Sequence, residues 1–210
     1  MPAYRSSAEA DVRTAVVERL RSLRPDARII HEINIDERKC RADVLAVTPT
    51  EIYAVEIKSE RDKLDRLEEQ AKSMLSVAHH VIAAVHDKHM PDLHYVSDVN
   101  YWIFPEAQRP VSLTRWYPAT DGWRAPSMKL NTALPHGAIS LLWRDELAEF
   151  CIRMGLNVSG RTVVSELRRL LWWRCSGEEL TRGICAALRR RSCVEADPPI
   201  YPTPPKEDRT

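Results

Sequence analysis

Residues 41–60 read RADVLAVTPTEIYAVEIKSE, in which a Pro-Thr turn signal separates two apolar runs. The runs predict the two strands of a β-hairpin. They also carry Asp43, Glu56 and Lys58 among apolar neighbours. Charged side chains are seldom fully buried unless they are paired or bind a metal. The hairpin is therefore both the centre of the predicted fold and its first candidate site.

The register of this hairpin decides whether its acids meet. With Pro49 and Thr50 at the centre of a tight turn, Leu45 faces Ala54, Val47 faces Ile52, and Asp43 faces Glu56. Strand side chains alternate between faces, so a slip of one residue would separate the two carboxylates. An exposed hairpin carrying a solvated ion cluster is the alternative, and such clusters are common.

Two carboxylates side by side repel each other unless a cation lies between them. Mg²⁺ takes oxygen ligands of this kind and retains water and phosphate oxygens, and Mn²⁺ is the expected substitute. Lys58 projects on the same face as Glu56 and would orient a water or stabilise developing negative charge. The pattern indicates metal-assisted hydrolysis of a phosphodiester.

The flanking segments predict a mixed α/β fold. Apolar residues at helical spacing, alternating strands and turn signals give, in order, a helix, three strands, a helix and a strand. The expected ranges are 6–23, 27–35, 41–47, 51–57, 60–78 and 80–86. This αβββαβ order predicts one mixed sheet with helices packed on it.

The remainder of the chain divides by composition. Residues 1–90 form the expected core, and 91–140 a proline-rich extension in which YWIF and SLTRWY are candidate strands. Residues 141–193 predict a helical subdomain, with helices near 144–154, 161–174 and 177–191, the last starting with a Ser176–Glu179 capping box. The proline-rich tail, 194–210, is expected to be disordered.

The amino-acid composition excludes few classes of protein. The 210 residues carry a net charge of +1, with 44% hydrophobic residues, as in ordinary globular proteins. Five cysteines without CxxC spacing fit reduced thiols better than a disulfide framework or a zinc site. The sequence lacks a signal-peptide pattern and a long apolar run, so we expect a cytoplasmic protein without a membrane partner.

The spacing D-x₁₂-E-x-K on a hairpin inside αβββαβ resembles the PD-(D/E)XK nuclease superfamily, which has the restriction-endonuclease-like fold. RADVLAV followed by EIKSERDKLDRLEEQ resembles an uncharacterised bacterial and phage branch of it. Residues 7–86 carry the resemblance. The matched positions are Glu32, Arg41, Asp43, Glu56, Lys58, Asp62, Leu64, Arg66, Leu67 and Gln70.

The resemblance implies a role for each matched residue. Asp43, Glu56 and the Ile57 carbonyl would hold the metal, and Lys58 would be catalytic. Glu32 would add a carboxylate, unless it is simply ion-paired.

Supporting roles are implied for four other residues. These are Arg41, the helix acids Glu9 and Glu18, and Gln70, which is otherwise a surface glutamine. Asp62 and Arg66 are more simply an i,i+4 pair. Ala42 stands where the family name has proline, and Met74 where related nucleases often have tyrosine; neither change removes a ligand.

The C-terminal part suggests a second contact with the substrate. Residues 145–167 resemble the small SAP-type DNA-binding helix pair, and phosphate contacts would then fall at Arg161, Arg168 and Arg169. Residues 141–193 hold ten Arg against six acidic residues. The alternative is a helical subdomain that packs on the core and serves a protein partner or a homodimer.

These observations lead to one functional expectation and one alternative. We expect a Mg²⁺-dependent endo- or exonuclease acting on DNA, in DNA repair or in phage or mobile-element biology, with RNA as a substrate not excluded. The alternative is a catalytically inactive nuclease-fold module that binds nucleic acid or a protein partner.

Overall fold

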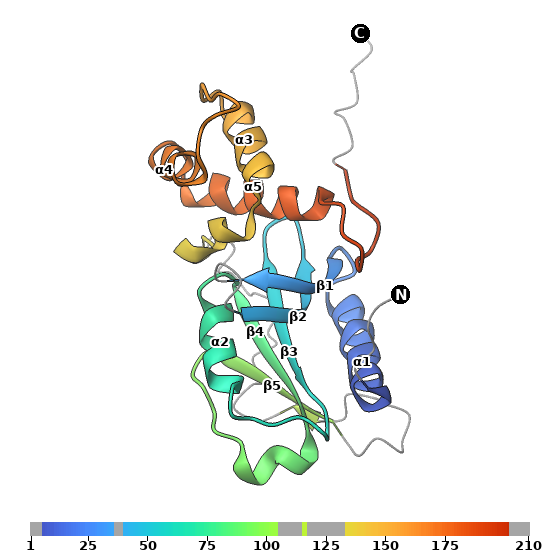
Figure 1. Ribbon diagram of the computed structural model, residues 1–210. Helices are drawn as coiled ribbons and strands as arrows, with labels where there is room; N and C mark the ends of the chain where they lie inside the picture. Colours follow the sequence, from blue (N-terminus) through green and yellow to red (C-terminus); the bar gives the residue numbers. More distant parts are fainter. Residues whose placement is uncertain (1–5, 36–39, 105–114, 117–132, 202–210) are drawn as a thin grey trace.

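The computed structural model describes residues 6–35, 40–104, 115–116 and 133–201 (Figure 1). The N-terminal elements are α1 (Ser7–Leu23), β1 (Arg28–Ile35), β2 (Cys40–Val47), β3 (Ile52–Lys58), α2 (Leu67–Leu75) and β4 (His80–His86). The predicted αβββαβ order is confirmed. The turn expected between the first two strands, at 36–39, lies outside the described residues.

The later elements extend this core and add helices to it. They are η2 (Asp87–Asp92), β5 (Val99–Phe104), β6 (Arg115–Trp116), η4 (His136–Leu141), α3 (Arg144–Arg153), α4 (Val164–Arg174) and α5 (Gly177–Arg190). YWIF belongs to β5, as predicted, and Arg115–Trp116 of SLTRWY form β6. The Ser176–Glu179 capping box is present. None of the described helices has the length and apolar character that a membrane span requires.

The sheet is mixed, as predicted, with strand order β1-β2-β3-β4-β5-β6. The pairs β1–β2, β2–β3 and β5–β6 are antiparallel, whereas β3–β4 and β4–β5 are parallel. Helix α1 covers one face, and α2 with the C-terminal helices covers the other (Figure 1). The C-terminal helices share the core on the α2 face, so the helical part is packed on the sheet.

The central hairpin has the predicted turn. Val47 pairs with Ile52 and Leu45 pairs with Ala54. The Thr48 amide donates to the Glu51 carbonyl at 2.9 Å, which closes the two-residue connection. The alternation of side chains along the strands and the Pro-Thr turn signal therefore predict the register correctly at the turn end of the hairpin.

The far end of the hairpin departs from strict alternation. The β2–β3 ladder ends at Val44 and Val55, one pair before the expected Asp43–Glu56 pair. Ala42 and Leu45 both belong to the core on the α2 face, although three residues apart they should point to opposite faces. Asp43 lies at this break, so its side chain does not simply continue the face of Leu45.

In strand β1, the alternation of side chains between the two faces of the sheet is also broken, next to Asp43. Ile30 and Ile33 both belong to the α2-side core. Between them, Glu32 has a φ of 56°, and the β1–β2 ladder lacks the Glu32–Asp43 pair that its register would place there. The breaks in β1 and β2 therefore lie opposite each other.

Two predicted helices begin later than expected. The helix predicted over 60–78 is α2, Leu67–Leu75, because Asp62 is used locally: its Oδ2 accepts from the Ser59 amide at 2.8 Å and from the Ser59 hydroxyl at 2.6 Å. The Asp62–Arg66 helix pair was consequently a wrong prediction. Likewise α4 begins at Val164 and not at 161.

The start of the tail also differs from the predicted disorder. Ala196 bridges Ile30 on the outer edge of β1, the His31 amide donates to the Glu195 carbonyl at 2.8 Å, and the Asp197 amide donates to the Ile29 carbonyl at 2.9 Å. The segment thus covers an edge that would otherwise expose unpaired backbone groups. Residues 202–210 lie outside the described residues.

Buried Arg28 joins this segment to α5. Its Nη1 donates to the Leu188 and Arg189 carbonyls at 2.7 and 3.0 Å, and its Nε donates to the Asp197 carbonyl at 3.0 Å. The carbonyls at a helix C-terminus lack partners within the helix. Arg28, only 1% exposed, therefore fastens the C-terminal part to the sheet.

We predict that Arg28→Met lowers the free energy of unfolding by about 3 kcal/mol, because the buried Leu188 carbonyl and two partly buried carbonyls lose a charged donor. Urea denaturation measures the change. Arg182→Met is the matched control, since Arg182 forms an exposed pair with Glu178 and should cost less than about 0.5 kcal/mol. Equal losses in the two variants would contradict the anchoring role of Arg28.

Candidate metal centre

A cleft of about 560 Å³ opens beside the break in β2. It is walled by the end of β3, the 62–66 segment and α2. Seven residues expected for the site line it: Glu9, Arg41, Asp43, Glu56, Ile57, Lys58 and Gln70. Glu32 does not line this cleft and lies on the other side of Asp43, in a second cleft along α1 and the tail segment.

Glu56 is the most buried acid of the cleft, at 4% exposure. Its Oε1 accepts from Lys58 Nζ at 2.7 Å and from Gln70 Nε2 at 2.5 Å, and Gln70 Oε1 accepts from Lys58 Nζ at 2.9 Å. Gln70 thus points from α2 into the site. The second oxygen of Glu56, Oε2, is buried and has no hydrogen-bond partner among the described residues.

Asp43 connects two groups of charges. Its Oδ2 accepts from the Ile57 amide at 2.8 Å, on β3, while its Oδ1 lies 3.4 Å from Arg13 Nη2, on α1. The carboxylate therefore bridges the opening between β2 and β3, where the ladder has ended.

The protonation of the two acids reflects this crowding. Burial raises the pKa of Asp43, against the opposing effects of the Ile57 amide and Arg13. Burial and then the charge of Asp43 raise the pKa of Glu56 to about 7, although Lys58 and Gln70 oppose the rise. Together the two carboxyls hold negative charge that the cleft only partly compensates near neutral pH.

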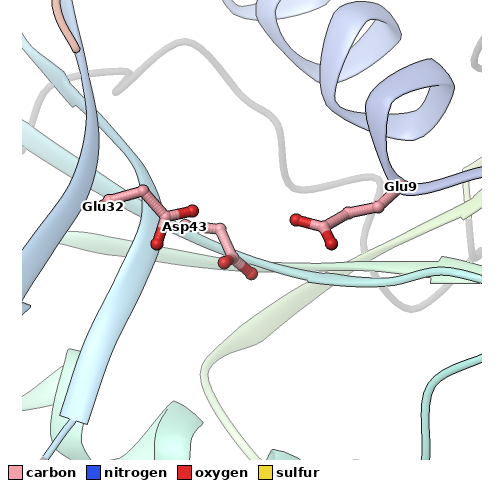
Figure 2. A group of neighbouring side chains, drawn as sticks. All are labelled: Glu9, Glu32 and Asp43. Atoms are coloured by element: carbon pink, nitrogen blue, oxygen red, sulfur yellow. The ribbon is translucent and has the colours of Figure 1, made fainter. Parts of the chain in front are cut away.

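Asp43 also belongs to a cluster of three acidic side chains on the side of the site that faces α1. Carboxylate oxygens of Glu9, Glu32 and Asp43 all lie within 4.8 Å of one another. Figure 2 shows Glu32 and Asp43 next to each other on neighbouring strands, with Glu9 facing them from α1. Arg13 Nη2 donates to Glu9 Oε1 and to Glu32 Oε1, both at 2.8 Å.

Glu32 reaches this group from a strained backbone. A φ of 56° is in the left-handed region, which costs a non-glycine residue on the order of 1 kcal/mol. Its Oε2 is paired with Arg41 Nε at 2.8 Å. Such strain persists only where the surroundings fix it, and the two arginines supply that restraint.

The residues of the cleft fit a divalent cation with a preference for oxygen. Carboxylates and backbone carbonyls are the ligands of Mg²⁺ and Mn²⁺. The unpartnered Oε2 of buried Glu56, beside the partly compensated Asp43, is the position where a ligand would remove an energetic cost. Cys40 also lines the cleft, but burial raises the pKa of its thiol to about 11, so the donor set is one of oxygens.

Four other predicted residues lie away from the cleft. Glu18 is exposed on α1 and lines the second cleft. Arg161 lies in the turn before α4, and Arg169 pairs with Glu166 at 2.6 Å. Arg168 and Arg169 line a separate cavity beside Trp172.

Arg13 is the site residue that sequence reasoning missed. The available signal was its i,i+4 spacing to Glu9 on one helix face. That spacing is also typical of exposed helix pairs, so it does not predict two further carboxylates from β1 and β2. Only the three-dimensional arrangement identifies Arg13 as central.

Comparison with known proteins identifies one family. Residues 3–119, more than half of the 210, match the family described as bacteriophage P4 protein cII. Among solved structures, the SPO1766 protein of unknown function from Silicibacter pomeroyi is 18% identical, with a TM-score of 0.40, covering 54% of this chain and 74% of that chain. No protein with curated annotation matches.

We predict that, in the metal-free protein, Glu56→Gln gains stability relative to wild type as pH rises. Because the pKa of Glu56 is raised to about 7, its contribution is full below about pH 4.5 and is lost as pH rises through 7. Glutamine cannot ionise. The unfolding free energy of Glu56→Gln minus that of wild type should therefore increase by on the order of 2 kcal/mol from pH 5 to pH 8. Urea denaturation in EDTA at both pH values measures it; a pH-independent difference would contradict the burial of a titrating Glu56.

Proposed function

The chain belongs to the bacteriophage P4 protein cII family, and we propose that it is a Mg²⁺-dependent nuclease that hydrolyses DNA phosphodiester bonds. The observation that carries the proposal is the unpartnered, buried Oε2 of Glu56 in a cleft with Asp43 and Lys58. The matched span, 3–119, includes all of these residues. The family takes its name from a phage protein, which favours phage or mobile-element biology over cellular repair.

Asp43, Glu56 and the Ile57 carbonyl are the groups that would hold the ion. When bound, Mg²⁺ would lower the pKa of a coordinated water and neutralise charge at the phosphorus. The chain's own contribution is the fixed position of these oxygens: Asp43 is held by the Ile57 amide, and Glu56 by Lys58 and Gln70. Preorganised ligands avoid reorganisation during the reaction.

Lys58 is the proposed catalytic cation. Its ammonium is held at 2.7 Å from Glu56 and 2.9 Å from Gln70. Three N–H donors are available, and these two contacts use two of them. The third donor can hold the attacking water or a phosphate oxygen in the cleft, whereas Gln70 keeps Lys58 beside Glu56.

DNA is the proposed substrate because the wall of the cleft offers two cations to phosphates. Lys63 and Arg66 line its wall and form no ion pair with the residues that the structure describes, so they are available to phosphates flanking the cleavage point. Arg161, Arg168 and Arg169 would add contacts farther away. A cytoplasmic location, where nucleic acid is reached and the five free thiols stay reduced, belongs to the same proposal.

We predict that Lys58→Met lowers the rate of Mn²⁺- or Mg²⁺-dependent DNA cleavage at least about 100-fold, because the reaction loses its positioned donor. The assay compares supercoiled, linear and single-stranded DNA, with RNA as a further substrate. Lys72→Met is the matched control, since Lys72 lies on α2 in an exposed pair with Glu68 and should leave the rate unchanged.

The outcome distinguishes the two functional classes. Equal rates for Lys58→Met and Lys72→Met would remove the catalytic role of Lys58. Tight DNA binding by the wild-type protein without cleavage of any substrate would instead favour the inactive nucleic-acid-binding module.

A further inference from the structure

Arg13 occupies the centre of the acid group formed by Glu9, Glu32 and Asp43. Its Nη2 lies 2.8 Å from Glu9 Oε1, 2.8 Å from Glu32 Oε1 and 3.4 Å from Asp43 Oδ1. One nitrogen of the guanidinium therefore faces three carboxylates that come from α1, β1 and β2. This is the arrangement that a bound cation would impose, and here a side chain supplies it.

The same side chain also restrains the backbone. Arg13 Nη1 donates to the Asp43 carbonyl at 2.6 Å, and the side chain of Arg13 is only 15% exposed. Burial alone would lower the pKa of Arg13, but the hydrogen bond with Glu9 and the charges of Asp43 and Glu32 outweigh it and raise that pKa. Arg13 thus stays charged and fixes both the position and the orientation of Asp43.

The net charge of the side chains around Arg13 and around Glu56 limits how many metal ions the site can accept. The four carboxylates are Glu9, Glu32, Asp43 and Glu56, and the three cations are Arg13, Arg41 and Lys58. With all of them ionised, one negative charge is left. One divalent ion reverses it to one positive charge, which matches a phosphodiester, whereas a second ion would add two more positive charges beside Arg13.

We propose that Arg13 takes the place of a second metal ion, so that the site binds one divalent cation, at Asp43 and Glu56. The inference rests on the proposed nuclease function and assigns Arg13 as a positioning residue. The guanidinium holds Glu9 and Glu32 away from the ion and, by its contact with Asp43 Oδ1, keeps Asp43 Oδ2 directed to the opening between β2 and β3.

Counting bound ions tests this directly. Mn²⁺ is titrated into the full chain, and free Mn²⁺ is followed by electron paramagnetic resonance, so the readout does not depend on cleavage. We expect one Mn²⁺ per wild-type chain and two for Arg13→Met, whose apolar side chain leaves three carboxylates without a cation. Arg13→Lys, which keeps a positive charge, should restore one, and adding Glu9→Gln to Arg13→Met should remove the second ion.

A second variant keeps the proposal testable if Arg13→Met does not fold. Glu32→Gln leaves Arg13 in place, so it should still bind one Mn²⁺ with less than about a tenfold change in affinity. Loss of an ion in this variant would show that Glu32 is itself a metal ligand. Lys72→Met serves as the control with an unchanged count.

The possible counts separate this inference from the proposed function. Two ions in wild type, or one ion in both wild type and Arg13→Met, would overturn the role of Arg13 and leave the nuclease site intact. No ion in wild type but one in Arg13→Met would support Arg13 as a built-in cation and contradict the Asp43–Glu56 metal site. No ion in either protein would overturn both.

Discussion

The ion pairs of Arg13 are the interaction on which the site depends. They join α1 to the two strands at the point where the strands change their alternation. Without a cation there, three carboxylates within 4.8 Å would repel one another, and Glu32, with its left-handed backbone, would keep only one of the two arginine contacts that restrain it. A single guanidinium therefore couples helix packing, sheet geometry and site electrostatics.

This coupling explains the shape of the cleft. Because the β2–β3 ladder ends before Asp43, the Asp43 carboxylate can accept from the Ile57 amide across the opening. Glu56 then lies on the α2 side, where Lys58 and Gln70 use only one of its two oxygens. The break in the sheet thus creates a place where two buried carboxylates converge with capacity left for a ligand.

The sequence predicts those features of the fold that depend on local patterns. A period of two and a Pro-Thr turn predict the pairing of Leu45 with Ala54, and the helical spacing of Val12, Val16 and Leu20 predicts α1. The break opposite Glu32 was not predictable, because a left-handed glutamate has no local signature. The break is stabilised by Arg13 from a distant helix, a tertiary effect.

The central proposal concerns two features of the metal-bound protein: the position of the single metal ion, and the ion pairs of Arg13 while that ion is bound. An anomalous-difference map from Mn²⁺-soaked crystals of the wild-type protein measures both. The predicted result is one Mn²⁺ peak bonded to carboxylate oxygens of Asp43 and Glu56, with Arg13 still paired to Glu9 and Glu32. A peak among Glu9, Glu32 and Asp43 with Arg13 displaced, or no peak beside Glu56, would contradict it.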